Sequence, residues 1–244
     1  MGVEDPGVVE AAIDLGYRHL DTAQVYGNEA VVGEAVANSD VPREELTVAT
    51  KLWVTDLAPG DVRGSARASL DRLGLSYVDL LYVHRPREAY DPAGTLPALD
   101  ELVEEGLVRR VGLSNFSVGE LSTARDHFDA PIAAHQVEHH PLFWRPALVA
   151  DAREHGYPLV AYSPLAAGEA FDLPAVREAA AAHGVSPAQV CLAWVLAREG
   201  VVAVPKASSV GHLRANLEAA DLRLDDAEVE RIDAVEREEE LFPE

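Results

Sequence analysis

The sequence predicts an α/β protein whose parallel strands form a (β/α)8 TIM barrel that lacks its first β-strand. Short apolar runs rich in β-branched residues alternate along the chain with amphipathic, helix-like segments, a pattern typical of repeated strand–helix units. The runs are apolar almost throughout, as expected of parallel strands covered on both faces. No GxGxxG motif follows any of them, which disfavours a Rossmann domain. We therefore expect a single barrel domain over residues 1–244.

The chain opens on a helix, which we expect over Pro6–Leu15. Seven strands are expected after it, and most are separated by a helix. The expected strands are Tyr17–Asp21, Leu46–Lys51, Val78–His84, Val111–Ser114, Ala133–Val137, Leu159–Tyr162 and Val201–Pro205. The helices expected between them include Glu29–Ala37, Asp61–Leu73, Leu96–Glu105, Val118–His127, Pro146–His155 and Pro187–Glu199.

Capping residues mark several of the helix starts. Ser117 and Asp225 each stand three residues before a glutamate, the spacing of a capping box. Ser186 precedes Pro187, which places a cap before a proline in the first helical turn. These signals predict helices that begin at all three positions.

The expected strands number seven, whereas eight close a barrel of this kind. Residues Met1–Asp5 form a poor strand, because they combine glycine with two acidic residues. A missing first strand would leave two apolar strand edges unpaired, which folded proteins avoid. We therefore expect that this sequence begins about one strand late, through a misplaced start or a shortened chain.

The charge balance is strongly acidic, with 42 acidic against 20 basic residues and a net charge of −22. Such a surface repels nucleic acids and anionic membranes, so neither is expected as a partner. Excess carboxylates with almost no lysine indicate a halophilic archaeon, where a Debye length of about 3 Å at molar salt screens the repulsion. GC-rich coding is the alternative, although it favours arginine over lysine without adding carboxylates.

The chain has a single cysteine, Cys191, and therefore no intrachain disulfide. No secretory leader and no apolar run long enough to span a bilayer is recognisable in the sequence. These features predict a cytoplasmic protein, which we expect to be a monomer.

Only two lysines occur, Lys51 and Lys206, and each ends an apolar, β-rich run. A cation at the exit of a buried strand suits catalysis or phosphate binding. The alternative at either position is a solvated lysine in a loop.

Four ionisable side chains lie at or just after successive strand ends: Asp21, Tyr26, Lys51 and His84. In a barrel they would meet at the C-terminal mouth, where active sites of this fold lie. Tyrosine ordinarily titrates near ~10, and a neighbouring lysine cation favours its phenolate, while a carboxylate keeps the lysine charged. Such a tyrosine can pass a proton to a carbonyl oxygen, and His84 can hydrogen-bond the same oxygen. We predict an active site at these four residues.

Seven segments of the chain, in order, resemble the sequence blocks of the aldo-keto reductase family, and together they cover nearly the whole chain. The segments are Gly16–Glu29, Thr50–Trp53, Asp79–His84, Val111–Phe116, Gln136–Pro141, Ala161–Leu165 and Val204–Lys206. The resemblance implies reduction of aldehydes or ketones, keto-sugar acids included, to alcohols by NADPH, with NADH as the possible substitute. It also implies that Tyr26 is the general acid, that Asp21 and Lys51 support it, and that His84 orients the carbonyl.

The resemblance further implies a set of cofactor-binding residues. These are Ser114, Asn115 and Gln136 for the carboxamide, Tyr162 for the nicotinamide ring, Ser163 and Leu165 for the pyrophosphate, Lys206 for the 2′-phosphate, and Ser209, His212 and Asn216 on the adenosine side. His212 stands where the family commonly has an arginine, and a mostly neutral imidazole holds a phosphate less well. The preference for NADPH over NADH therefore stays open.

Two further residues are expected to contact a small carbonyl substrate. Trp53, immediately after Lys51, is the expected pocket wall. Arg85 stands where the family often has tryptophan, and it would attract anionic substrates; an outward, ion-paired arginine is the alternative. No metal site is expected, because the adjacent His139 and His140 diverge in an extended strand.

Two other functions compete with carbonyl reduction. The first is a non-catalytic, nicotinamide-binding barrel that regulates a partner. The second is an aldolase that uses Lys51 as a Schiff base. A Schiff-base lysine needs a lowered pKa, whereas we expect pairing with Asp21 to raise it.

Overall fold

The computed structural model describes residues 2–243, which fall into two compact units with a boundary between His135 and Gln136. Unit 1 is Met1–His135 and unit 2 is Gln136–Glu244. Both alternate strands with helices in the way the sequence predicts.

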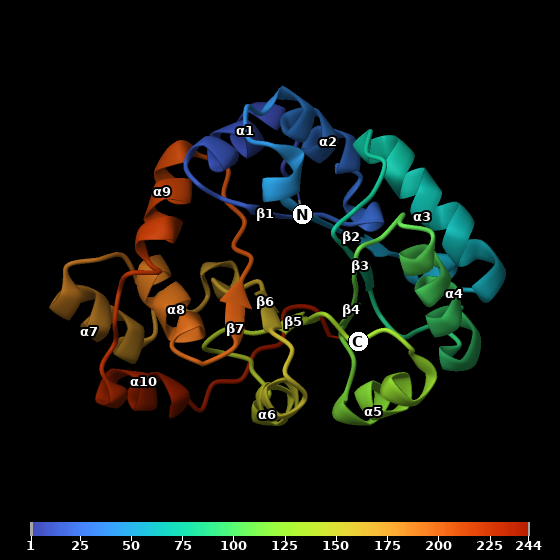
Figure 1. Ribbon diagram of the computed structural model, residues 1–244. Coiled ribbons are helices and arrows are strands. Elements are labelled where there is room, and N and C mark those ends of the chain that lie inside the picture. Colours follow the sequence, from blue (N-terminus) through green and yellow to red (C-terminus); the bar gives the residue numbers. More distant parts are fainter. Residues whose placement is uncertain (1, 244) are drawn as a thin grey trace. The chain divides into compact units, whose positions relative to one another are not determined.

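Within its described residues, unit 1 contains four strands, five α-helices and three short 3-10 helices, and Figure 1 shows their arrangement. The strands are β1 (His19–Asp21), β2 (Thr47–Leu52), β3 (Leu80–Val83) and β4 (Val111–Ser114). The α-helices are α1 (Pro6–Asp14), α2 (Glu29–Asn38), α3 (Pro59–Leu73), α4 (Pro92–Glu104) and α5 (Val118–His127). The 3-10 helices are η1 (Gln24–Tyr26), η2 (Arg43–Glu45) and η3 (Val54–Asp56).

The strands of unit 1 are parallel and pair in chain order, β1 with β2, β2 with β3 and β3 with β4. Asp21 lies opposite Ala49, and Lys51 lies opposite Tyr82. Strands β3 and β4 are buried throughout, and β2 almost throughout. Because the strands run in the same direction, the side chains at their carboxyl ends gather at one edge of the sheet.

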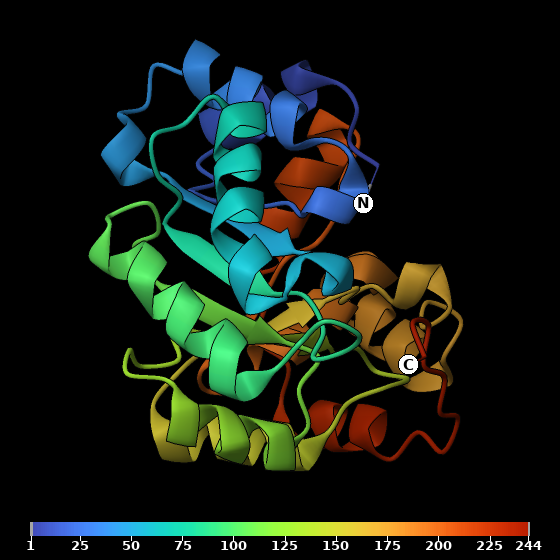
Figure 2. The same cartoon turned by 90° about the vertical axis from the view of Figure 1, so that its right-hand side faces the viewer.

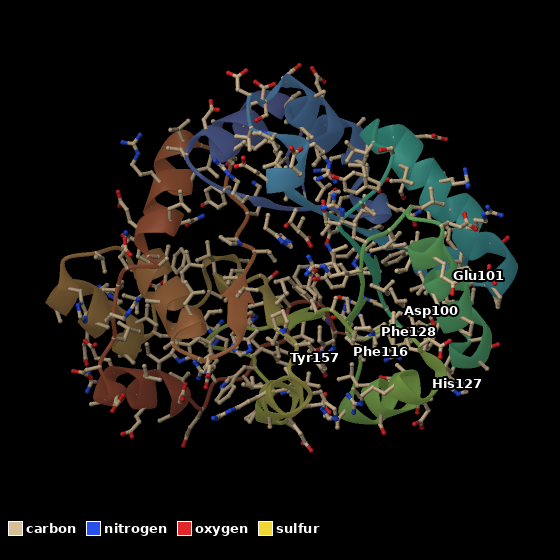
Figure 3. The ribbon with its side chains drawn as sticks, viewed as in Figure 1. Asp100, Glu101, Phe116, His127, Phe128 and Tyr157 are labelled. Atoms are coloured by element: carbon tan, nitrogen blue, oxygen red, sulfur yellow. The ribbon has the colours of Figure 1, made fainter. Side chains whose placement is uncertain are left out.

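Helices α1 to α5 pack in sequence, each against the next, along strands β1–β4 (Figures 1 and 2). The α2–α3 contact depends on Gly33, because a side chain there would run into the backbone of Leu73. Asp100 fastens α4 to the end of α5 by accepting the N–H groups of Asp129 and Ala130 at 2.9 and 3.0 Å. Figure 3 labels Asp100 and the buried Phe128 in this region.

Unit 2 holds the remaining strands and helices. β5 (His135–Glu138) crosses the boundary, and β6 (Leu159–Tyr162) pairs in parallel with β7 (Val201–Ala203). The helices are α6 (Pro146–His155), η4 (Ala166–Gly168), α7 (Pro174–His183), α8 (Pro187–Leu196), α9 (Val210–Glu218) and α10 (Asp226–Asp233). Trp194 of α8 is fully buried, and its indole N–H donates to Asp233 of α10 at 2.7 Å.

Within residues 2–243, no single helix is both long and apolar enough to cross a membrane. The α7–α8 pair passes such a test jointly, by length and composition, although it bends by 99° between the two helices. The apolar side chains of α8 from Val190 to Val195 are buried inside the protein.

All seven expected strands are present, and β4 and β6 have the predicted bounds. The capping boxes at Ser117 and Asp225 are confirmed, and Ser186 forms a third one with Gln189. Helix α4 begins one turn before the predicted Leu96, because Asp91 accepts the N–H of Ala93 and a proline occupies the first turn.

Helix α7 is not among the predicted ones. The apolar side chains of α7 are mostly alanines, so few large apolar residues mark its buried face in the sequence. The described residues before α1 are not in a strand. Closure into a barrel and the absent first strand stay predictions.

Candidate active site

Lys51, near the end of β2, is fully enclosed in unit 1. Its ammonium group donates to the Asp21 carboxylate at the end of β1 and to the carbonyl oxygen of Thr22 at 2.9 Å. The Asp21 side chain is itself 12% exposed. A buried ammonium is costly unless it is paired, so these two acceptors fix both the position and the orientation of the lysine.

The predicted direction of the Lys51 pKa is wrong. Burial lowers the pKa below that of an ordinary lysine, and the attraction of Asp21 offsets only part of this effect. The pKa therefore no longer argues against a Schiff-base role. The geometry does, because the amine is enclosed and already donates to Asp21 and Thr22.

Tyr26 and Trp53 both lie against His84. The Tyr26 ring, from η1, meets the imidazole edge-on with ring centroids 5.8 Å apart. The Trp53 ring, just after β2, meets it edge-on at 5.0 Å. The ammonium nitrogen of Lys51 lies 5.0 Å from the centroid of the Tyr26 ring. The four predicted catalytic side chains and the predicted pocket wall thus occupy one region of unit 1.

His84 follows β3 and is buried, with a backbone N–H that donates to Leu52 at 3.1 Å. Burial, helped by the nearby cations of Lys51 and Arg85 and opposed by Asp21, lowers the pKa of its imidazole to about 3. Its Nδ1 atom has no hydrogen-bond partner within residues 2–243. The imidazole is therefore neutral at physiological pH, and it can hydrogen-bond a ligand without adding charge.

The predicted carboxamide residues Ser114 and Asn115 stand at the end of β4. Asn115 adopts a left-handed backbone with φ of 61°, a conformation that asparagine tolerates better than most residues. Its side-chain amide donates to the carbonyl oxygen of His84 at 3.0 Å and to the hydroxyl of Ser114 at 3.1 Å. These bonds tie the two residues to the predicted catalytic histidine.

In unit 2, three predicted cofactor residues follow one another at the end of β6. The half-buried Tyr162 ring lies edge-on to Phe242, with centroids 5.9 Å apart. Ser163 has a left-handed backbone with φ of 50°, and its carbonyl accepts the N–H of Ala166 at 2.9 Å. Leu165 is half-buried in the same turn, whereas Gln136 is buried in β5. The strained turn is typical of a ligand-binding loop.

The predicted adenosine-side residues surround the start of α9. Lys206 and His212 are exposed. The Ser209 hydroxyl caps α9 by accepting the N–H of His212 at 3.3 Å, so it has a structural role whatever it binds. The side-chain nitrogen of Asn216 is buried without a hydrogen-bond partner in the described chain. An exposed cation near a helix start and an unsatisfied amide fit a phosphate and a purine base respectively.

Two polar anchors in the structure were not predicted from the sequence. Buried Glu138 of β5 accepts the N–H groups of Leu241 and Phe242 at 2.7 and 3.1 Å, and it pairs with His140 at 2.9 Å. This anchor holds Phe242 beside Tyr162 in unit 2. The second is Gln24 in unit 1, which bonds the backbone of Trp53. The available signals were Glu138 as the one carboxylate of β5 and an amide two residues before Tyr26.

No group of three or more His, Cys, Asp or Glu side chains within residues 2–243 is arranged to hold a metal ion. His140 is instead bonded to Glu138, and the backbone N–H of Leu142 donates to its other ring nitrogen at 3.3 Å. The buried His139 lies between aromatic contacts to Trp144 and Trp194.

Known proteins resemble this chain along almost its full length. A methylglyoxal reductase, DkgB, of Escherichia coli O157:H7 is 38% identical over 231 residues, which cover 93% of this chain and 86% of the relative. A 9,11-endoperoxide prostaglandin H2 reductase of Trypanosoma cruzi is 35% identical over 98% of this chain and 85% of its own.

Solved structures give the same result. The aldose reductase of Schistosoma japonicum matches with a TM-score of 0.90 and 32% identity, covering 99% of this chain and 87% of that one. A candidate 2,5-diketo-D-gluconic acid reductase B matches with a TM-score of 0.92 and 35% identity, covering 96% of this chain and 83% of that one. The sequence model of the Aldo/keto reductase family matches residues 5–237. The chain therefore belongs to the aldo/keto reductase family and is an oxidoreductase that reduces carbonyl compounds with a nicotinamide cofactor.

Proposed function

We propose that Tyr26 is the general acid of this reductase, that Lys51 and Asp21 support it, and that His84 orients the carbonyl oxygen of the substrate. The observation that carries this proposal is the cluster in unit 1. A buried ammonium paired with a carboxylate lies 5.0 Å from the Tyr26 ring, and that ring contacts a neutral imidazole. Few arrangements other than acid–base chemistry explain a lysine buried so completely beside a phenol.

The roles follow from the charges. The Lys51 cation favours negative charge on the Tyr26 oxygen as its proton leaves, and Asp21 holds that cation in place. Neutral His84 donates a hydrogen bond to the carbonyl oxygen, which places the oxygen within reach of the phenol. A reduced nicotinamide, when bound, supplies the hydride to the carbonyl carbon.

For the cofactor, we propose NADPH, held by the residues that match the cofactor-binding positions of the family. Ser114, Asn115, Gln136 and Tyr162 would hold the nicotinamide. Ser163 and Leu165 would contact the pyrophosphate. Lys206 would meet the 2′-phosphate, with Ser209, His212 and Asn216 nearby in the sequence. The buried, unsatisfied side-chain nitrogen of Asn216 supports an adenine contact.

For the substrate, we propose small aldehydes and keto-sugar acids. Relatives of this chain include a methylglyoxal reductase and a candidate diketogluconate reductase. Trp53 would wall the pocket, because its ring lies 5.0 Å from the His84 ring. Arg85, which lies close enough to His84 to lower the pKa of its imidazole, would favour substrates with a carboxylate.

The remaining features complete the proposal. The protein would act as a monomeric, single-domain (β/α)8 barrel in the cytoplasm of a salt-adapted organism, without nucleic-acid or membrane partners. The net charge of −22 supports this setting, because it favours solubility in high salt and repels phosphate-rich surfaces. Assays in molar KCl are therefore the appropriate condition.

Tyr26→Phe tests the assignment. We expect its turnover of an aldehyde with NADPH to fall by about 10²–10⁴-fold, with the dissociation constant for NADPH unchanged. Stopped-flow NADPH oxidation and cofactor fluorescence measure the two quantities. The matched control is Tyr90→Phe, since Tyr90 packs on Phe116 at 5.4 Å and is assigned no catalytic role. Full turnover in Tyr26→Phe would show that Tyr26 is not the general acid.

A further inference from the structure

We propose that Gln24 is a positioning residue that fixes Tyr26 and Trp53 relative to each other where both rings contact His84. The inference rests on the catalytic role proposed for Tyr26. It adds a residue to which the sequence motif assigned no role.

The side-chain amide of Gln24 is bonded at both ends. Its oxygen accepts the backbone N–H of Trp53 at 2.8 Å. Its nitrogen donates to the hydroxyls of Ser65 and Ser69 on α3 at 2.8 and 3.1 Å. A backbone N–H can only donate, so the amide has one workable orientation, with its oxygen towards Trp53.

Gln24 and Tyr26 belong to one tight turn. They are the first and last residues of η1, which is closed by Tyr26 N–H to Ala23 and Gly27 N–H to Gln24, both at 3.1 Å. The preceding Thr22 is fixed to β2, because its N–H donates to Ala49 at 2.9 Å. A displacement of Gln24 would therefore move Tyr26 with it.

On the other side of the bond, Trp53 is the first residue after β2 and precedes η3. Gln24 takes the Trp53 N–H, which would otherwise need another acceptor. One amide thus holds the backbone that carries the proposed acid and the backbone that carries the proposed pocket wall. Both rings contact the same imidazole, at 5.8 and 5.0 Å.

Catalysis is sensitive to such placement, since a misplacement of about 1 Å can cost on the order of 10²-fold in rate. Loss of the Gln24–Trp53 bond should therefore appear in kcat and in the KM for the carbonyl. Binding of NADPH should change little, because Gln24 is not among the residues proposed to hold it.

Gln24→Met tests this inference, because methionine keeps the length of the side chain and removes the amide's hydrogen bonds to Trp53, Ser65 and Ser69. We expect kcat for an aldehyde to fall by about 10- to 100-fold and the KM for the aldehyde to rise, with the NADPH dissociation constant within about twofold. Gln24→Glu keeps an acceptor for Trp53, and the Ser69 hydroxyl, which accepts from Arg72, can rotate to donate to it, whereas the Ser65 hydroxyl already donates to Asp56. We expect it to restore kcat to within about threefold of the parent.

The matched control is Gln189→Met, which removes the capping bonds of a glutamine at the start of α8 in unit 2. It should lower the melting temperature slightly and leave kcat and KM unchanged. If Gln24→Met behaves like this control, Gln24 is merely structural and the inference is wrong. Equal losses in Gln24→Met and Gln24→Glu would also overturn it, since the bond to Trp53 would then not matter.

Tyr26→Phe separates the two proposals. If that variant is inactive while Gln24→Met keeps full kcat and KM, only the role of Gln24 fails. If Tyr26→Phe retains turnover, the role of Tyr26 fails, and the positioning role that depends on it fails as well.

Discussion

The two lysines of this chain occupy opposite physical environments. Lys51 in unit 1 has no exposed surface and donates to Asp21 and Thr22. Lys206 in unit 2 is exposed, and it stands just before the capped start of α9. Their neighbours differ in the same way, because Tyr26 and Trp53 contact the buried His84, whereas His212 is exposed like Lys206.

The contrast separates two ways of using a positive charge. The cluster around Lys51 is assembled before any ligand arrives, so its charges need little rearrangement during the reaction. An exposed cation such as Lys206 keeps its water, and it contributes only where a phosphate replaces that water. We therefore expect substitutions around Lys51 to change activity and stability strongly at any salt concentration. Substitutions around Lys206 should change cofactor binding only slightly, and less so at high salt.

Lys51→Met is expected to have the largest effect. It leaves the Asp21 carboxylate without its cation, and breaking a buried pair costs about 3–5 kcal/mol of unfolding free energy. Turnover should also fall by at least about 100-fold. Urea unfolding and NADPH oxidation measure the two effects. Lys206→Met is the matched control, with stability expected within about 0.5 kcal/mol of the parent. Equal stability of Lys51→Met and Lys206→Met would contradict the claim that only the buried lysine stabilises the fold.

The enclosure of His84 predicts a pH dependence of stability. The pKa is about 3 in the folded protein and 6.5 for an ordinary histidine. The unfolded chain therefore takes up the proton first, and this group lowers stability progressively as pH falls from 6.5 towards 3. Relative to His84→Gln, the parent should lose about 1.4 kcal/mol per pH unit in that range.

Urea unfolding at several pH values measures this difference. At pH 7.5 the histidine is neutral in both states, so the difference between parent and variant there provides the baseline. If the unfolding free energies of the parent and of His84→Gln change in parallel between pH 6.5 and 4, His84 is not enclosed as described.

Lys206→Met should give the smallest effect. If Lys206 meets the 2′-phosphate, the variant should bind NADPH about fivefold more weakly, the factor that about 1 kcal/mol gives. NADH binding should be unchanged, because NADH lacks that phosphate. The difference between the NADPH dissociation constants of parent and variant should become smaller in molar KCl. Fluorescence titration at low and high salt measures it, and equal loss for both cofactors would exclude a phosphate contact.

The sequence predicted most of the fold because the strands carry their own signals. β4 lies between Arg110 and Asn115 and β6 lies between Pro158 and Ser163, and the predicted limits of both strands match the structure. Strand β3 is shorter than predicted, since Val78 forms only an isolated bridge with Val108. Helix α4 was placed too late because its first turn is signalled by Asp91 and Pro92 rather than by apolar spacing.

The sequence also placed the four ionisable side chains at strand ends, and unit 1 brings them together. It did not predict the pKa direction of Lys51, because that depends on how completely the side chain is buried. The bonds of Glu138 to the backbone of Leu241 and Phe242 join segments far apart in the chain. No local pattern reports such a contact. Trp53 and Gln24 are also far apart in the chain, so the sequence did not predict their bond.

The complete enclosure of Lys51 has a practical consequence for labelling. An acylating dye applied to the folded protein finds Lys206 as the one solvent-accessible lysine within residues 2–243. A fluorophore attached there sits beside the start of α9. It would report arrival of a nucleotide at that helix by a change in emission, without any engineered cysteine.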